Sequence, residues 1–108
     1  MTQHSPTDAN DLDSFESEAR EGINHWLQEN LGGSLVDAKR LERWRPQWKV
    51  SYSVGDEVRA VLVRGDRPNA CEHDLRFEME VMQALEANGI KVPHIHGWMP
   101  SPKAFVMD

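Results

Sequence analysis

The chain has a single cysteine, no long apolar run and no basic, apolar leader at its amino terminus. One thiol, Cys71, cannot form an internal disulfide, and by itself it cannot build a cysteine-rich zinc site. No stretch approaches the roughly 18 apolar residues that a membrane-crossing helix needs. The first residues, MTQHSPTDAN, lack the features of a secretion signal. We therefore expect a cytoplasmic protein with no membrane partner.

Several catalytic signatures are absent as well. The sequence has no G-x-x-x-x-G-K-[ST] phosphate loop, no H-E-x-x-H zinc motif and no serine-base-acid arrangement. His94 and His96 would face one side of an expected strand, but no third and fourth metal ligand lies near them. Cys71 and the acids after it are best explained as a helix start, where acidic side chains suit the dipole. We expect no metal site, and the hydrolase and P-loop interpretations lose support.

Charge is unevenly distributed along the 108 residues, which are enough for one small domain. The net charge of −6 comes from residues 1–30, which hold seven acids and one base, Arg20. Five basic residues then lie between Lys39 and Lys49 around one acid, Glu42. This basic stretch could meet phosphate or could be a solvated surface, and charge alone favours the surface.

The chain divides into a leader, a helix and a larger lobe. Residues 1–10 are polar and aperiodic, which predicts a disordered leader. Residues 11–33 carry apolar side chains at intervals of three and four, which predicts an amphipathic helix that ends at Gly32 or Gly33. These apolar residues are Leu12, Phe15, Ala19, Ile23, Trp26, Leu27 and Leu31. Residues 34–108 form the lobe.

The lobe is predicted to belong to the α+β class. Its clearest part is a β-hairpin, because KVSYSV (49–54) and the β-branched run 58–64 flank the short turn VGDE. A further strand is possible over 35–41. Pro46 lacks a backbone donor, so the segment RWRPQW before the hairpin is predicted to be a loop or a strand edge.

The rest of the lobe is predicted to contain a helix and two more strands. Apolar residues recur at helical spacing over 72–88, and Gly89 followed by Pro93 marks the end of that helix. HIHGWM and KAFVM indicate two short strands around the turn PSP. Together with the first helix, these elements predict an antiparallel sheet of about five strands with one long helix packed on it.

Three motifs follow one another in this lobe. The strand AVLVR ends in Arg64, which shares a face with Leu62 because side chains alternate along a strand. The next helix contains E-x-x-V-M-x-A-L from Glu78 to Leu85, and G-I-x-V-P then leads to a strand pair that ends in V-M-D. In this order, roughly residues 31–108 resemble the small lobe of the aminoglycoside phosphotransferase-like kinases.

The resemblance implies a nucleotide site for ATP. It places Arg64 where these kinases have the lysine that contacts the α and β phosphates, and Glu78 where a helix glutamate holds that side chain. It also implies that Leu62 touches the adenine and that backbone groups around Met107 bond the adenine edge. Arginine keeps its charge and can grip phosphate through two parallel bonds, so the replacement is chemically reasonable.

The loop that covers the nucleotide in this family usually contains glycines, but WRPQWK (44–49) has none. We expect the side chains of Arg45, Trp48 or Lys49 to cover the nucleotide instead, or the cover to be poor. Trp44 and Trp48 have an alternative role, because such rings commonly pack beneath a hairpin.

The residues that complete catalysis in this family belong to its large lobe, and this sequence ends at FVMD, before that lobe. The resemblance therefore implies that Mg²⁺ and a small-molecule hydroxyl acceptor are bound only in a full-length protein. We expect no catalytic residue in this chain and no phosphoryl transfer by the chain alone.

A different class of function is a non-catalytic interaction module. The acidic first helix could dock on a basic partner surface, and the apolar and basic face of the lobe could bind a partner. Nucleic-acid binding is a weaker version of this hypothesis: Trp44 and Trp48 could stack bases within the basic stretch, but the overall acidity opposes it.

Overall fold

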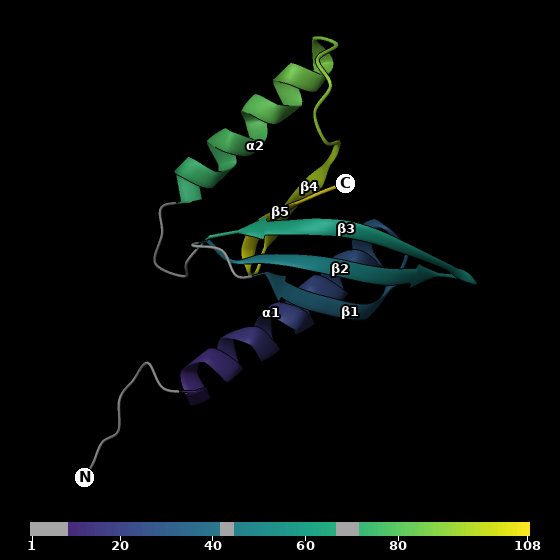
Figure 1. Cartoon of the computed structure of the whole chain (residues 1–108), viewed down its shortest axis with the longest axis vertical. Coiled ribbons are helices and arrows are strands. Elements are labelled where there is room, and N and C mark those ends of the chain that lie inside the picture. The colour runs from purple at the N-terminus through teal and green to yellow at the C-terminus, as the bar shows by residue number, and fades with distance from the viewer. Residues whose placement is uncertain (1–8, 42–44, 67–71) are drawn as a thin grey trace.

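The computed structural model describes residues 9–41, 45–66 and 72–108, which contain two helices and five strands (Figure 1). In chain order these are α1 (Ala9–Asn30), β1 (Ser34–Leu41), β2 (Gln47–Val54), β3 (Glu57–Gly65), α2 (Glu72–Ala87), β4 (Ile95–Pro100) and β5 (Lys103–Met107). The predicted leader lies mostly outside the described residues, although Ala9 and Asn10 already belong to α1. In the described part of the chain, neither helix combines the length and the apolar character needed to span a bilayer.

The strands form one antiparallel sheet in the order β1-β2-β3-β5-β4. The expected α+β class with a five-stranded antiparallel sheet is confirmed. Strand β5 pairs with both β3 and β4, so the last strand of the chain lies inside the sheet and β4 forms an edge. α1 and α2 lie on opposite sides of this sheet (Figure 1).

The larger core lies between α1 and the sheet. Ala19, Ile23, Trp26 and Leu27 are all buried, which confirms the predicted apolar stripe of this helix. They belong to one cluster with buried strand residues, which include Trp48, Val50, Tyr52, Val61, Val63, Met99, Ala104 and Val106. Because one fully buried aliphatic side chain contributes roughly 1.5–3 kcal/mol, this cluster is the main source of stability that the fold offers.

Polar contacts and one glycine fix the position of α1. The indole Nε1 of Trp26 donates a hydrogen bond to the carbonyl oxygen of Trp98 at 2.9 Å, and Asn24 Oδ1 accepts one from the backbone N–H of Leu35 at 2.9 Å. Gly22 faces the β4-β5 turn so closely that an added Cβ would overlap the carbonyl oxygen of Ser101. The helix and the turn are therefore in backbone-to-backbone contact.

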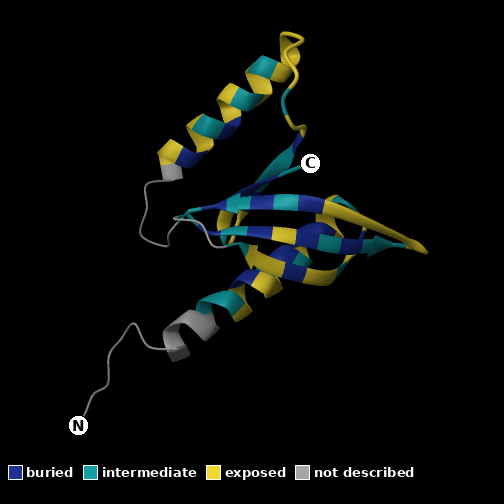
Figure 2. Ribbon diagram, in the orientation of Figure 1, coloured by how far each residue is buried: buried dark blue, intermediate teal, exposed yellow. Residues whose placement is uncertain are grey.

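The smaller core lies between α2 and the other face of the sheet. It consists of Leu75, Met79, Ile95 and Phe105, with Met82, Trp98 and Met107 partly buried around it. On the opposite side of the same helix, Phe77 and Val81 are 58% and 41% exposed, and Figure 2 shows buried and exposed residues alternating along α2. Only one stripe of this helix is therefore covered by the described residues.

Two glycines with positive φ mark the predicted turns. Gly55, with φ of +60°, begins the two-residue turn between β2 and β3, a position where hairpin turns favour glycine. Gly89, with φ of +83°, ends α2: its N–H donates to Glu86 and the N–H of Ile90 donates to Leu85, both at 3.0 Å. This is the paired hydrogen-bond pattern of a glycine C-cap.

Candidate functional site

One face of β1, β2 and β3 remains open. On this side of the sheet, α2 packs over β4 and β5. The side chains that β1, β2 and β3 place on the same side are exposed or half-buried. We call this surface the open face and define it by Lys39, Lys49, Ala60, Leu62, Arg64 and Met107. α2 bounds this surface where it packs over β5 and β4.

The register of the sheet brings several predicted site residues into one row. Lys39 is the Cα partner of Lys49, Lys49 of Leu62, and Leu62 of Met107. Directly paired residues on an antiparallel sheet share a face and lie about 5 Å apart at their Cβ atoms. Lys49, Leu62 and Met107 therefore lie side by side although the chain separates them widely.

Arg64 and Glu78 meet at the edge of the open face. Arg64 is the Cα partner of Gln47 and Phe105, in the row next to Lys49, Leu62 and Met107. Its Nε donates a hydrogen bond to Glu78 Oε1 on α2 at 2.9 Å, and the two side chains are 25% and 33% exposed. The strand-end cation and the helix carboxylate are thus in direct contact, and both remain accessible to a ligand.

Arg45 joins this pair from the segment just before β2. Its Nη1 lies 3.7 Å from Glu78 Oε2, and its Nε lies 3.8 Å from Asp66 Oδ2, just after β3. The N–H of Gly65 donates to the carbonyl oxygen of Pro46 at 2.9 Å, which holds the chain next to Arg45 against the end of β3. The result is a network of two guanidinium groups and two carboxylates at one corner of the open face.

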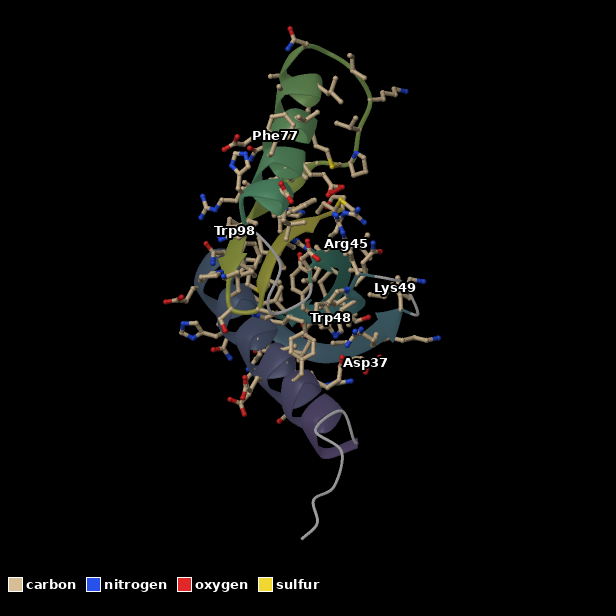
Figure 3. The ribbon with its side chains drawn as sticks, turned by 90° about the vertical axis from the view of Figure 1, so that its left-hand side faces the viewer. Asp37, Arg45, Trp48, Lys49, Phe77 and Trp98 are labelled. Carbon is tan, nitrogen blue, oxygen red and sulfur yellow. The ribbon has the colours of Figure 1, made fainter. Side chains whose placement is uncertain are left out.

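Trp48 does not belong to the site. Its side chain is fully buried in the larger core, 6.1 Å from the Phe15 ring between centroids, and its Nε1 donates to both carboxylate oxygens of Glu16 at 3.2 and 3.3 Å. The prediction that Trp48 covers a nucleotide is therefore wrong, and the alternative of packing beneath the hairpin is confirmed. Figure 3 shows Arg45 on the α2 side of the sheet and Trp48 nearer α1. Trp44 lies outside the described residues.

The basic stretch of the sequence is divided between the two faces of the sheet. Lys39 and Lys49 lie on the open face, whereas Arg40, as the Cα partner of Trp48, lies on the α1 side. Arg40 Nη1 contacts Glu16 Oε1 at 2.5 Å, and its guanidinium lies 5.3 Å from the centre of the Trp48 ring. Arg43 lies outside the described residues. The described basic residues thus do not form one continuous surface for a nucleic acid.

The end of the chain was predicted to offer backbone groups to a base. The backbone N–H of Asp108 is already a donor to the carbonyl oxygen of His94 at 3.0 Å. Met107 has ladder partners on both sides, Leu62 and Ile95, and its side chain is half-buried against the smaller core. The side chain of Met107 is therefore the part of this segment best placed to contact a ligand on the open face.

His96 in β4 and His94 just before this strand both have carboxylate partners. His94 Nδ1 lies 3.1 Å from Glu86, His96 Nε2 lies 2.6 Å from Asp108 Oδ1, and the two rings meet edge to face at 5.1 Å. Among the described residues, histidine, cysteine and acidic side chains form no group of three or more that could hold a metal ion. Cys71 lies outside the described residues.

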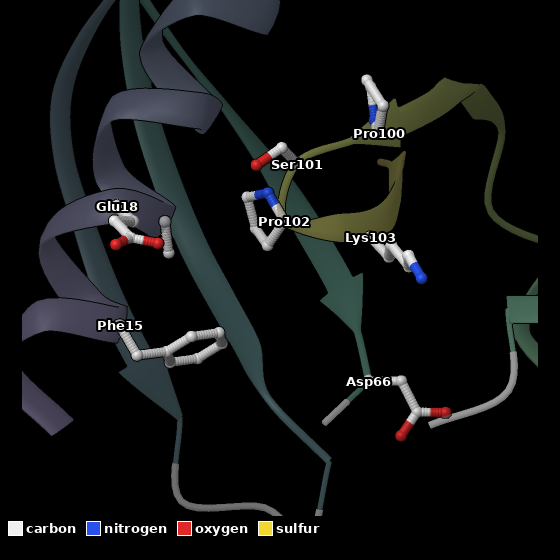
Figure 4. Close-up of a pocket in the computed structure, with 8 residues that line it drawn as sticks. Phe15, Glu18, Asp66, Pro100, Ser101, Pro102 and Lys103 are labelled. Carbon is white, nitrogen blue, oxygen red and sulfur yellow. The ribbon is translucent and has the colours of Figure 1, made fainter. Parts of the chain in front are cut away.

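The structure also has a cavity that sequence reasoning missed. It lies on the α1 side of the sheet, has a volume of about 220 Å³, and is drawn in Figure 4. Its lining comes from α1, from Asp66 after β3 and from the β4-β5 turn, and comprises Phe15, Glu18, Ala19, Asp66, Pro100, Ser101, Pro102 and Lys103. No local sequence signal could identify it, because these segments are brought together only by the order of the strands.

Comparison with protein-family models, with curated proteins and with solved structures found no match to this chain. The geometry of the open face and its corner is therefore the basis on which a function can be proposed.

Proposed function

We propose that this chain is the nucleotide-binding small lobe of an ATP-dependent phosphotransferase that acts on a hydroxyl group of a small molecule. The observation that carries the proposal is the 2.9 Å hydrogen bond between Arg64, at the end of β3, and Glu78 on α2. It couples a sheet cation to a helix carboxylate beside an open sheet face. This is the arrangement that phosphoryl-transfer enzymes of the kinase type use to position a phosphate-binding side chain.

The chemistry of Arg64 supports this role. A guanidinium has five N–H groups, and the hydrogen bond to Glu78 uses the one on Nε. The terminal N–H groups can then form two parallel, charge-assisted bonds to phosphate oxygens, which are stronger than bonds between neutral groups. Glu78 limits the rotamers of Arg64, so less conformational entropy is lost when a phosphate binds.

The neighbouring row of the open face supports binding of the base. Leu62 and Met107 are half-buried apolar side chains on adjacent strands, and Lys49, across from Leu62, adds an aliphatic stem with a charged end. A planar purine against this row would lie next to Arg64 in the following row. Along β3, the row proposed to contact the base is followed by the residue proposed to contact the phosphates, which is the order in which a nucleotide carries these groups.

The proposed ATP site covers only part of a reaction. In this proposal Mg²⁺ and the hydroxyl acceptor are bound by a further lobe of a longer protein, because the two described carboxylates at the corner, Glu78 and Asp66, already pair with arginines. The chain alone is expected to bind ATP without transferring its γ-phosphate. Phosphorylation of any acceptor by the purified chain would contradict this part of the proposal.

Binding of ATP to the Arg64→Ala variant, measured by isothermal titration calorimetry, tests the proposal. Loss of a charge-assisted interaction of about 1.5–3 kcal/mol should weaken affinity by roughly 10-fold to 150-fold. Arg59→Ala is the matched control, because Arg59 is on the same strand and pairs with Glu57 at 2.8 Å, far from α2. Wild-type protein that binds no ATP at millimolar concentration, or equal affinity in wild type and Arg64→Ala, would refute the nucleotide site.

The second candidate function is a non-catalytic interaction module. The exposed apolar stripe of α2 favours it, because Phe77 and Val81 lie one helical turn apart and face away from the smaller core. Asp74 and Glu80 are exposed on this helix, so a partner with basic residues around an apolar segment fits best. A basic amphipathic peptide that binds wild type but not Phe77→Ser, together with no ATP binding, would favour this function over the first.

A further inference from the structure

Gln47 is the direct neighbour of Arg64 on the same side of the sheet. The two residues are Cα partners in the antiparallel pairing of β2 with β3, so their side chains share a face and their Cβ atoms lie about 5 Å apart. The Gln47 side chain is half-buried. The adjacent row, Lys49, Leu62 and Met107, is the one proposed to contact the base. Gln47 therefore belongs to the row of the proposed phosphate contact.

The two neighbours of Arg64 in this row differ in how far they are covered. Phe105, its Cα partner on β5, is fully buried in the smaller core, where α2 packs on the sheet. Gln47, its Cα partner on β2, lies on the opposite side of Arg64, away from the strands on which α2 packs. The row is therefore closed on the side of Phe105, and a ligand can approach Arg64 from the side of Gln47.

The orientation of the Arg64 guanidinium leaves hydrogen-bond donors for such a ligand. Its Nε donates to Glu78 Oε1 at 2.9 Å, and Glu78 comes from α2, on the Phe105 side of the row. A guanidinium is planar and has five N–H groups that point in several directions. Because the Nε–H points towards α2, N–H groups of the terminal nitrogens point away from that helix. An oxyanion that accepts from them lies within reach of the Gln47 side chain.

The chemistry of the Gln47 side chain suits an oxyanion at this point. Its amide has two N–H donors, and in the part of the chain that the structure describes it takes part in no hydrogen bond. A hydrogen bond from an amide to a charged oxygen is stronger than one between neutral groups. Glutamine is also uncharged, so it does not repel the guanidinium on the next strand as a lysine or arginine would.

We propose that Gln47 is a second phosphate-binding residue of this site and that its side-chain amide donates a hydrogen bond to the phosphate group that Arg64 binds. The inference depends on the proposed nucleotide function. In this arrangement Arg45 keeps its contacts with Glu78 and Asp66, because the donors to the phosphate come from Gln47 and from the terminal nitrogens of Arg64. The phosphate is then bound from two adjacent strands.

Calorimetric titration of the full chain with ATP tests this inference. Gln47→Ala should weaken ATP binding by about tenfold, because a hydrogen bond to a charged group is lost. Gln47→Glu keeps the size of the side chain but replaces its N–H donors with a carboxylate, so it should weaken binding more than Gln47→Ala does. Two control variants should bind ATP within about twofold of wild type. Gln28→Glu adds the same charge at an exposed position of α1, and Ser51→Ala removes a hydroxyl from the same side of β2, beyond the row proposed for the base.

The outcomes separate the two proposals. If Arg64→Ala weakens ATP binding and Gln47→Ala does not, the role of Gln47 is refuted and the nucleotide site remains. If Gln47→Glu binds ATP no more weakly than Gln47→Ala, the amide does not donate to a phosphate, and the inference is again refuted while the site remains. If wild type binds no ATP, both proposals fail. The unfolding temperature of each variant shows whether it is folded before its affinity is compared, and the nearly isosteric Gln47→Glu provides a test if Gln47→Ala does not fold.

Discussion

The contact between α1 and the β4-β5 turn predicts an unusual effect of Gly22→Ala. In the interior of an exposed helix this substitution normally stabilises a protein by about 1 kcal/mol, because alanine is the better helix former. At Gly22, however, the new Cβ would overlap the carbonyl oxygen of Ser101 and lie 2.8 Å from its carbonyl carbon and 3.0 Å from Pro102 Cδ. Two of these three atoms belong to the backbone, so no change of rotamer removes the overlap.

The difference between the cost of the steric overlap and the gain in helix propensity gives the expected change in the free energy of unfolding. Overpacking of a well-packed site costs about 1–3 kcal/mol, and the upper part of that range applies when helix or turn must move as a unit. Movement of α1 would also stretch the 2.9 Å hydrogen bond from Trp26 to Trp98. After subtracting the gain in helix propensity, we expect Gly22→Ala to lower the free energy of unfolding by about 2 kcal/mol.

Urea denaturation and thermal unfolding, both followed by circular dichroism, measure this effect. A loss of about 2 kcal/mol in a domain of this size corresponds to a fall of roughly 10 °C in the unfolding temperature. Ser17→Ala, at an exposed position of the same helix, is the control and should be neutral or slightly stabilising. A Gly22→Ala variant as stable as wild type, or more stable, would show that α1 does not contact the turn as described.

Two further predictions concern the faces of the sheet and of α2. Trp48→Phe removes the hydrogen bonds to Glu16 and part of a fully buried ring, so urea denaturation should show a loss of about 1–3 kcal/mol. The affinity of the folded variant for ATP should be unchanged, and a parallel fall in affinity would place Trp48 in the site after all. Leu75→Ala should cost about 2–5 kcal/mol, whereas Phe77→Ser, on the exposed stripe, should change stability by less than about 0.5 kcal/mol in the same measurement. Similar losses for both α2 variants would contradict the orientation of this helix.

Much of the β2-β3 part of the site follows from the sequence. A hairpin with a two-residue turn has a fixed register, so placing the turn at Gly55 already makes Lys49 the partner of Leu62 and Gln47 the partner of Arg64. The C-cap at Gly89 similarly fixes where α2 ends. Such local signals are strong because neighbouring residues decide them.

The prediction for Trp48 and Lys49 shows where local reasoning was incomplete. Adjacent strand residues point to opposite faces, so these two side chains cannot both cover one ligand. The sequence alone does not say which of them faces α1, because that depends on packing against Phe15 and Glu16, which lie more than thirty residues before Trp48. The buried stripe of α1 selects Trp48 for the core and leaves Lys49 on the open face.

The rest of the site is non-local. Arg45 and Glu78 come close only because α2 packs over β5 and β5 pairs with β3. If β5 lay at the outer edge of the sheet beyond β4, α2 would be farther from β3. Neither periodicity nor turn chemistry determines the order of strands that are distant in sequence. For the same reason the cavity beside α1 had no signal in the sequence.

Because the two cores differ in size, local unfolding at α2 and at α1 is expected to cost different free energies. Among the side chains that the structure describes, four buried ones attach α2, while thirteen form the cluster that holds α1 to the sheet. Segments with fewer buried contacts exchange their amide hydrogens through partial unfolding at lower free energy than the rest of a domain. A nucleotide held by β3 and α2 together would bridge these two cooperative units, so its binding energy would appear as slower exchange in α2 above all.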